Sequence, residues 1–94
     1  MDLFFEWDPD KASRNRRVHG VTFGEASTVF GDPLSMTFHD RLHSVLEERF
    51  ILIGRSANGR LLVVVHSEQG DVVRIISARR AQRREQNVYE QATS

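Results

Sequence analysis

The most regular hydrophobic pattern in the chain lies between residues 48 and 80, where two runs rich in Ile, Leu and Val flank Asn58-Gly59. This dipeptide is the strongest short-range signal of a two-residue hairpin turn, because both turn positions need a positive φ. With that turn, Ile51 lies opposite His66. Because side chains alternate along a strand, one face is apolar and can take helices, and the other has polar groups around an apolar middle. The second face carries Arg49, Ile51, Ile53, Arg55, Leu62, Val64, His66 and Glu68.

A third strand follows the loop at residues 69–71. Its register depends on the loop length, because loops of two and three residues exchange the two faces. A two-residue loop sends Arg74 to the apolar side, where an unpaired charge is costly. A three-residue loop sets Arg74 beside His66 and points Val73 and Ile75 into the core. We favour the three-residue loop, which brings an arginine and a histidine together.

The flanking segments carry alternating strand and helix signals. Residues 3–7 alternate as a short strand, and Asp8-Pro9 opens a helix that Gly20 ends. A capping box at residues 22–25 begins a second helix, and residues 34–38 alternate as another strand. After Ala78 the sequence has high helix propensity, with Ser77 as a cap. The order β-α-α-β-β-β-β-α predicts the α+β class, with one antiparallel central sheet and helices mainly on one face.

Composition narrows the class of protein. Residues 1–94 are long enough for one domain with one core, and the chain has no cysteine, which excludes disulfides and cysteine-based metal or redox sites. The N-terminal residues lack the pattern of a signal peptide and no apolar run could span a bilayer, so we expect a cytoplasmic protein. The formal net charge is zero, but 12 of the 13 basic residues are arginine, the type that binds phosphate in bidentate fashion. Five of these arginines lie between residues 74 and 84 without an acid.

The candidate chemistry lies on the polar hairpin face. His39 and His43 have the spacing of two metal ligands on a helix, but they lie in a predicted loop without a third ligand, so we expect no metal and no cofactor. No glycine-rich phosphate loop, serine nucleophile elbow or glycosidase-type acid pair is present. Arginine, histidine and glutamate around one face suit metal-free cleavage of RNA by the ribose 2′-OH. That reaction needs a base, an acid and guanidinium groups that stabilise the phosphoryl oxygens.

Each of these residues also has a structural interpretation. His66 is either the proton-transfer group or a half-buried histidine that is hydrogen-bonded within the sheet. Arg49 opposite Glu68 is typical of a cross-strand ion pair, and His19 suits the end of a helix dipole. The arginines at residues 79–80, at the junction of strand and helix, are the best phosphate-binding candidates.

The sequence as a whole resembles the BrnT family of bacterial toxins. The resemblance covers residues 5–26, 29–34, 43–56 and 73–90, with the combinations WDPDK, HGVTF, ERFILIG and IISARRA. It implies a RelE-like fold, ribonuclease activity that halts translation, and neutralisation by a cognate BrnA-like antitoxin. It also implies that operator DNA is bound only through the antitoxin, and that the partners include RNA but no membrane.

The resemblance extends to single residues. The positions that match family motifs are Lys11, Asn15, His19, Glu48, Arg49, His66, Arg74, Arg79, Arg80, Glu85 and Tyr89. We predict catalytic roles for Glu48, Arg49, His66 and Arg74. We predict that RNA phosphates are bound by Lys11, His19, Arg55, Arg79 and Arg80.

Two other functions fit the same sequence. A non-catalytic module could bind nucleic acid or an acidic protein through the basic first helix and residues 79–84, and an inactive toxin could persist as a corepressor of its antitoxin. The near-neutral charge departs from the basic character of RelE-like toxins and predicts weak nonspecific RNA binding. We also expect the apolar middle of the polar face to be covered in part by the antitoxin.

Overall fold

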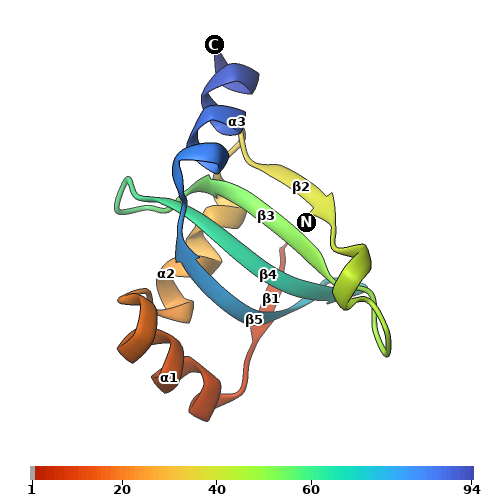
Figure 1. The fold of residues 1–94 in the computed structure, drawn as a ribbon. Coiled ribbons are helices and arrows are strands. Elements are labelled where there is room, and N and C mark those ends of the chain that lie inside the picture. Colours follow the sequence, from red (N-terminus) through yellow and green to blue (C-terminus); the bar gives the residue numbers. More distant parts are fainter. Residues whose placement is uncertain (1) are drawn as a thin grey trace.

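The computed structural model describes residues 2–94, and these form the predicted order β-α-α-β-β-β-β-α (Figure 1). The strands are β1 (Phe4–Glu6), β2 (Met36–His39), β3 (Phe50–Arg55), β4 (Leu61–Gln69) and β5 (Val72–Arg80). The α-helices are α1 (Pro9–His19), α2 (Phe23–Thr28) and α3 (Arg83–Thr93), with 3₁₀ turns at Val29–Gly31 and Arg41–His43. The α+β class and the order of elements are confirmed. Among the helices of residues 2–94, none has the length and apolar character needed to cross a bilayer.

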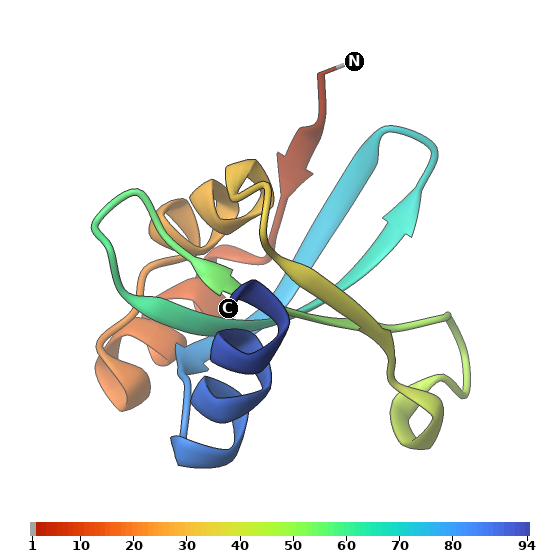
Figure 2. The ribbon, with the colours of Figure 1, turned by 90° about the horizontal axis from the view of Figure 1, so that it is seen from above.

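The sheet has the strand order β1-β5-β4-β3-β2. Its neighbouring strands are antiparallel except for β1, which runs parallel to the first part of β5. The sheet is therefore mixed rather than wholly antiparallel. The loop between β2 and β3 and the β4–β5 hairpin project from one end of the sheet, and the β3–β4 hairpin projects from the other (Figure 2). These two loops therefore lie at the end of the sheet where β1 begins.

The β3–β4 turn is one residue longer than predicted. Ser56 pairs with Arg60, whose backbone oxygen accepts from the Ser56 N–H at 2.8 Å, and the Gly59 N–H donates to the Ser56 oxygen at 2.9 Å. Gly59 has a φ of 83°, whereas Asn58 does not enter the positive-φ region. The loop therefore consists of three residues and closes on a left-handed glycine, the next most common hairpin geometry.

Because of this extra loop residue, each side chain of β3 shares its face with the other set of β4 side chains than predicted. His66 lies opposite Phe50 instead of Ile51. We call the two sides of the sheet the α1–α2 face and the α3 face, after the helices that cover them; in Figure 1, α2 lies behind the strands and α3 in front. The core of the α1–α2 face includes Leu52, Leu62, Val64, Val73, Ile75 and Ala78, packed against Val21, Phe23, Ala26 and Val29. The smaller core of the α3 face joins Tyr89 to Ile53 and Val63.

The prediction of a polar face with an apolar middle is wrong for the same reason. Leu62 and Val64 are wholly buried in the main core, and Ile53 lies beneath α3. Only Ile51 is half-buried. The protein's own helices cover these side chains, so an antitoxin is not required to do so.

The β4–β5 hairpin also differs from the prediction. Gln69 pairs with Val72, so the loop is Gly70-Asp71, a two-residue loop placed one position later than the one considered from the sequence. Val73 points into the core as predicted. A β-bulge then gives β5 an extra residue, Ile76, where the register shifts between Val65 and His66.

Candidate functional site

Four of the predicted functional arginines share the α3 face, because they occupy matching positions on β3, on the residue directly before it and on β5. They are Arg49, Arg55, Arg74 and Arg79. Arg74 lies opposite Ser67, whereas His66 lies opposite Ile75 on the other face. The predicted contact between His66 and Arg74 is therefore wrong, and the cause is the β4–β5 register. The sheet separates the imidazole from the arginines.

His66 is a buried residue of the main core. The residue is 0% exposed, and its ring meets the Phe30 ring edge-on, with the centroids 4.8 Å apart. Its Nε2 lies 2.8 Å from a Glu68 carboxylate oxygen, and its Nδ1 has no partner among residues 2–94. The structural interpretation of this histidine, hydrogen-bonded within the sheet, agrees with the geometry. A substrate on the α3 face cannot reach the ring.

Glu48 and Arg74 line one cleft of about 320 Å³ at the β4–β5 end of the sheet. The cleft is lined by Glu6, Glu47, Glu48, Ser67, Glu68, Gln69, Val72 and Arg74. The Glu48 side chain is 76% exposed, and its Oε1 lies 3.8 Å from His39 Nε2. The Arg74 guanidinium donates to Glu6 Oε2 at 2.7 Å. Glu48 and Arg74 therefore share this cleft, whereas His39 lies opposite Phe50 on the α1–α2 face and approaches only Glu48.

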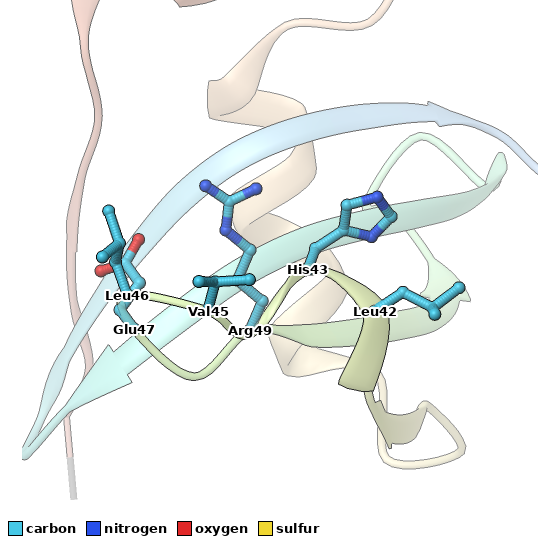
Figure 3. Close-up of a pocket in the computed structure, with 6 residues that line it drawn as sticks. All are labelled: Leu42, His43, Val45, Leu46, Glu47 and Arg49. Atoms are coloured by element: carbon cyan, nitrogen blue, oxygen red, sulfur yellow. The ribbon is translucent and has the colours of Figure 1, made fainter.

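Arg49 lies in an adjoining pocket of about 450 Å³, formed by the loop between β2 and β3. The lining residues are Leu42, His43, Val45, Leu46, Glu47 and Arg49 (Figure 3). The shared residue Glu47 connects this pocket to the cleft. The Arg49 Nε is buried and has no hydrogen-bond partner among residues 2–94. Three of the four predicted catalytic residues, Glu48, Arg49 and Arg74, thus lie at one end of the molecule.

The predicted phosphate-binding arginines of β3 and β5 are scattered. Arg79 holds Glu85 of α3 through two hydrogen bonds of 2.9 and 2.6 Å, and these bonds raise the pKa of Arg79 and lower that of Glu85. Arg55 lies over the Tyr89 ring, 5.5 Å from its centroid. Arg80 falls on the α1–α2 face opposite Leu62. Arg55 and Arg80 line a common pocket of about 430 Å³ beside the β3–β4 turn.

Lys11 and His19 line a groove of about 300 Å³ between α1 and β5. Asn15, between them on the helix, does not project with them: it is buried and hydrogen-bonded to the backbone of Ala78. Ser77 lines the groove and lies opposite Val65 on the α3 face. The groove therefore reaches the edge of the face that carries the arginines.

Several residues of this region were not among the predicted site residues, although helical spacing carries a signal for Arg14. Glu6 reaches Arg74 only because β1 pairs in parallel with β5. Ser67 enters the cleft through the corrected register, and Arg14 joins the α1 groove through helical spacing. His39 has in the sequence only the spacing of a metal ligand, and its position beside Glu48 follows from the fold of the loop. Among residues 2–94, no three His, Asp or Glu side chains are grouped as metal ligands.

Comparison with known proteins agrees with the resemblance seen in the sequence. A sequence model described as the ribonuclease toxin BrnT of a type II toxin-antitoxin system matches residues 7–85. The chain belongs to the BrnT family. Its fold is also that of the Brucella abortus ribonuclease toxin BrnT, known from a 1.1 Å crystal structure. The two share a TM-score of 0.64 and 21% identity, over 88% of this chain and 99% of that one. A search of curated proteins gave no match.

Membership of the BrnT family makes this chain a relative of ribonuclease toxins that act in type II toxin-antitoxin systems, and such a family implies a cognate antitoxin. The predicted family and the predicted fold class are confirmed. The solved structure supports the fold alone at this level of identity, so the roles of individual residues rest on the geometry described above.

Proposed function

We propose that the protein is a toxin that cleaves RNA in the cytoplasm without a metal ion, arrests translation and is neutralised by its antitoxin. The observation that carries this proposal is the gathering of Glu48, Arg49 and Arg74 at one end of the sheet, in a chain of the BrnT family. These residues supply a proton acceptor and two guanidinium groups, which the cleavage of an RNA phosphodiester requires.

In the proposed reaction the ribose 2′-oxygen attacks the adjacent phosphorus and the bond from phosphorus to the 5′-oxygen breaks. Glu48 accepts the proton of the 2′-OH, and Arg49 and Arg74 stabilise the charge on the phosphoryl oxygens. His39 lies on the α1–α2 face, but its side chain is 40% exposed and its Nε2 lies 3.8 Å from Glu48 at the end of the sheet. There it takes the place predicted for His66 and donates a proton to the leaving 5′-oxygen. The products are a 2′,3′-cyclic phosphate and a 5′-hydroxyl.

Arg74 is paired with Glu6, and a substrate must compete for it. The two side chains are 44% and 52% exposed, and exposed ion pairs contribute only about 0–1 kcal/mol. The pair has one hydrogen bond, from Arg74 Nη1 to Glu6 Oε2, whereas a phosphate can accept two from the same guanidinium. Glu6 therefore positions Arg74 in the free protein without preventing phosphate binding.

The rest of the RNA is proposed to follow the basic groove. Lys11, Arg14 and His19 line the groove between α1 and β5, which meets the α3 face at Ser77. Arg55 and Arg80 provide a second set of positive charges at the far end of the sheet, and Arg79 contributes less because Glu85 already holds it. Each neutralised phosphate of a single strand changes the slope of log K against log salt by about −0.7. We therefore expect a slope of about −1.4 from Lys11 and Arg14 of this groove.

The test is cleavage of a single-stranded RNA by the purified protein in excess EDTA. Arg49→Gln, Arg74→Gln and Glu48→Gln are each expected to slow cleavage by about 100-fold or more, as removal of one transition-state donor does. Arg17→Gln, an exposed arginine of α1 outside the groove, is the matched control. Full activity of the Arg74→Gln variant would refute the site, and loss of cleavage in EDTA would refute metal independence.

Variants of His39 and His66 distinguish the two candidates for the proton donor. His39→Asn is expected to remove the basic limb of the pH–rate profile, because the imidazolium then no longer protonates the leaving oxygen. His66→Gln is expected to lower thermal stability and to retain the rate per folded molecule. The opposite result would return the catalytic role to the buried histidine.

The acidity of the cleft favours one alternative function. Four glutamates line it together with Arg74, and they repel RNA phosphates. An inactive toxin that persists as a corepressor of the antitoxin would have such a cleft. Purified protein that binds its antitoxin but cuts no RNA, with or without ribosomes, would support this alternative.

A further inference from the structure

Exposed apolar side chains are concentrated on one segment of the chain. Among residues 2–94, eight large hydrophobic side chains are exposed, and five of them lie between residues 34 and 46. The most exposed are Leu42, Val45 and Leu46, at 86%, 84% and 99%. Isolated exposed apolar residues are ordinary, but a contiguous group on a surface marks an interaction site.

These side chains form the wall of a pocket around a positive charge. Figure 3 shows the Arg49 guanidinium between the side chains of His43 and Glu47, with Leu42 and Val45 along the same loop. The Arg49 Nε is buried and without a hydrogen-bond partner among the described residues. A buried donor left unpaired costs about 1–3 kcal/mol, so a partner that supplies an acceptor here gains that free energy.

We propose that residues 41–48, which we call the docking loop, bind together with Arg49 a single segment of the cognate antitoxin. The segment presents apolar side chains to Leu42, Val45 and Leu46, and one carboxylate to Arg49. This inference rests on the proposed function, because it takes the antitoxin of the BrnT family as the partner and names where on this toxin it binds. Charge complementarity at Arg49 and the exposed apolar wall are the two observations that select such a segment.

The chemistry of the loop favours a protein over RNA. Single-stranded RNA is bound by aromatic side chains on which bases stack and by cations along the backbone. Three of the six residues that line the pocket are aliphatic and Glu47 lies beside Arg49, while the one ring, His43, is hydrogen-bonded to Asp40. A protein segment with an apolar face and one acid satisfies both parts of the pocket.

The position of the loop gives the interaction a consequence. Arg49 is one of the two guanidinium groups proposed to stabilise the reacting phosphate. A carboxylate of the antitoxin that binds Arg49 removes this group from the RNA site, and the antitoxin then covers the adjoining cleft that holds Glu48 and Arg74. The antitoxin thus inhibits by competing with RNA for the same side chain.

The experiment measures the affinity of the purified toxin for the purified product of the neighbouring gene. The test variant is Leu42→Gln with Leu46→Gln, which adds no charge beside Arg49 and changes two side chains so exposed that their replacement leaves the core intact. The control is Leu3→Gln, an exposed leucine before β1. We expect the double variant to bind at least about 100-fold more weakly, as the loss of central apolar anchors does, and the control to bind as the unchanged protein does. Arg49→Gln is expected to weaken binding as well.

Three further measurements give the other outcomes. RNA cleavage without antitoxin should be unchanged in the double variant; its loss would show that the loop binds RNA and would overturn the proposal. Sedimentation should show no change in oligomeric state; loss of a dimer would identify the loop as an interface between copies. Unchanged antitoxin affinity of the double variant would also overturn the proposal. Because the affinity is measured without RNA, a toxin that cuts no RNA but loses antitoxin binding in the double variant would refute the catalytic proposal and leave the docking loop supported.

Discussion

Asn15 is the side chain that attaches α1 to the sheet, and its replacement is the sharpest test of the fold around the basic groove. β1 covers only the first three residues of β5, so the edge of β5 at Ala78 has no strand beside it. The Asn15 amide takes that place. Its nitrogen donates to the oxygens of Ala78 and Val21 at 2.8 and 2.9 Å, and its oxygen accepts from the Ala78 N–H at 3.1 Å.

The size of the effect follows from these three hydrogen bonds. In Asn15→Ala, three buried backbone groups lose their partners, and each unsatisfied group costs about 1 kcal/mol or more. The free energy of unfolding should therefore fall by about 3 kcal/mol, which for a domain of this size lowers Tm by about 12–24 °C. Arg14→Ala, at the exposed neighbouring position, should change it by less than about 0.5 kcal/mol.

Asn15→Asp adds a prediction with a defined sign. The variant places a carboxylate against two carbonyl oxygens in a buried site, so burial and repulsion raise its pKa in the folded state. The folded variant then binds a proton more readily than the unfolded chain does, and its deficit in stability should be largest at neutral pH and shrink as the pH falls toward about 4. Urea unfolding at several pH values measures both variants. A loss below about 1 kcal/mol for Asn15→Ala, or a deficit for Asn15→Asp that grows in acid, would refute the role of this amide.

Three further predictions concern the contacts that hold the sheet and α3. Gly54→Ala should destabilise the fold by about 1–3 kcal/mol in urea unfolding, because its Cβ would lie 2.8 Å from a neighbouring side-chain carbon; full stability would contradict that approach. Tyr89→Phe removes the 2.7 Å hydrogen bond to Asp32 and should cost about 1.5–3 kcal/mol and speed amide exchange in α3, whereas unchanged exchange would show that α3 is held by other contacts. The side-chain hydrogen bond from Arg60 lowers the pKa of Glu25, so this pair stabilises the fold above the unfolded pKa and loses that contribution as the pH falls through the lower folded value. Glu25→Gln should flatten the acid limb of the stability curve, and an unchanged limb would assign it to other groups.

Local signals in the sequence predicted the helix ends that are capped by residues nearby in the chain. Asp8 caps α1 by accepting from the Asp10 N–H, and Gly20 ends it with a φ of 69°. Thr22 caps α2 by accepting from the backbone N–H of Glu25, but the Glu25 carboxylate binds Arg60 and Ser56 instead of completing the predicted capping box. These features depend on residues at most four positions apart, so the sequence order alone specifies them.

The last helix shows where local signals fail. Ser77 was predicted as its cap, but β5 continues to Arg80 and the cap is Gln82, with Glu85 completing a capping box. Ser77 pairs with Val65 across the sheet. Tertiary pairing therefore overrides the helix propensity of the residues after Ala78.

The arrangement of the site was beyond prediction because it depends on loop lengths that differ by one residue. Both turns of the central meander depart from the predicted loops, and in a strand a shift by one position moves every side chain to the opposite face. His66 and Arg74 were separated in this way. Glu6 could not be placed at all, because its position depends on the pairing of two strands 66 residues or more apart.

The ion pairs explain how a chain with 12 arginines and no net charge presents a selective positive site. Arg60 is held by Glu25, Arg74 by Glu6 and Arg79 by Glu85, so much of the positive charge around the sheet is matched within the protein. Among residues 2–94, only Arg49 and His66 have a buried side-chain nitrogen without a hydrogen-bond partner. His66 lies in the closed core, whereas Arg49 opens into a pocket beside the cleft. An unmatched guanidinium at an opening is suited to either a phosphate or a carboxylate, and it is there that RNA and antitoxin would compete.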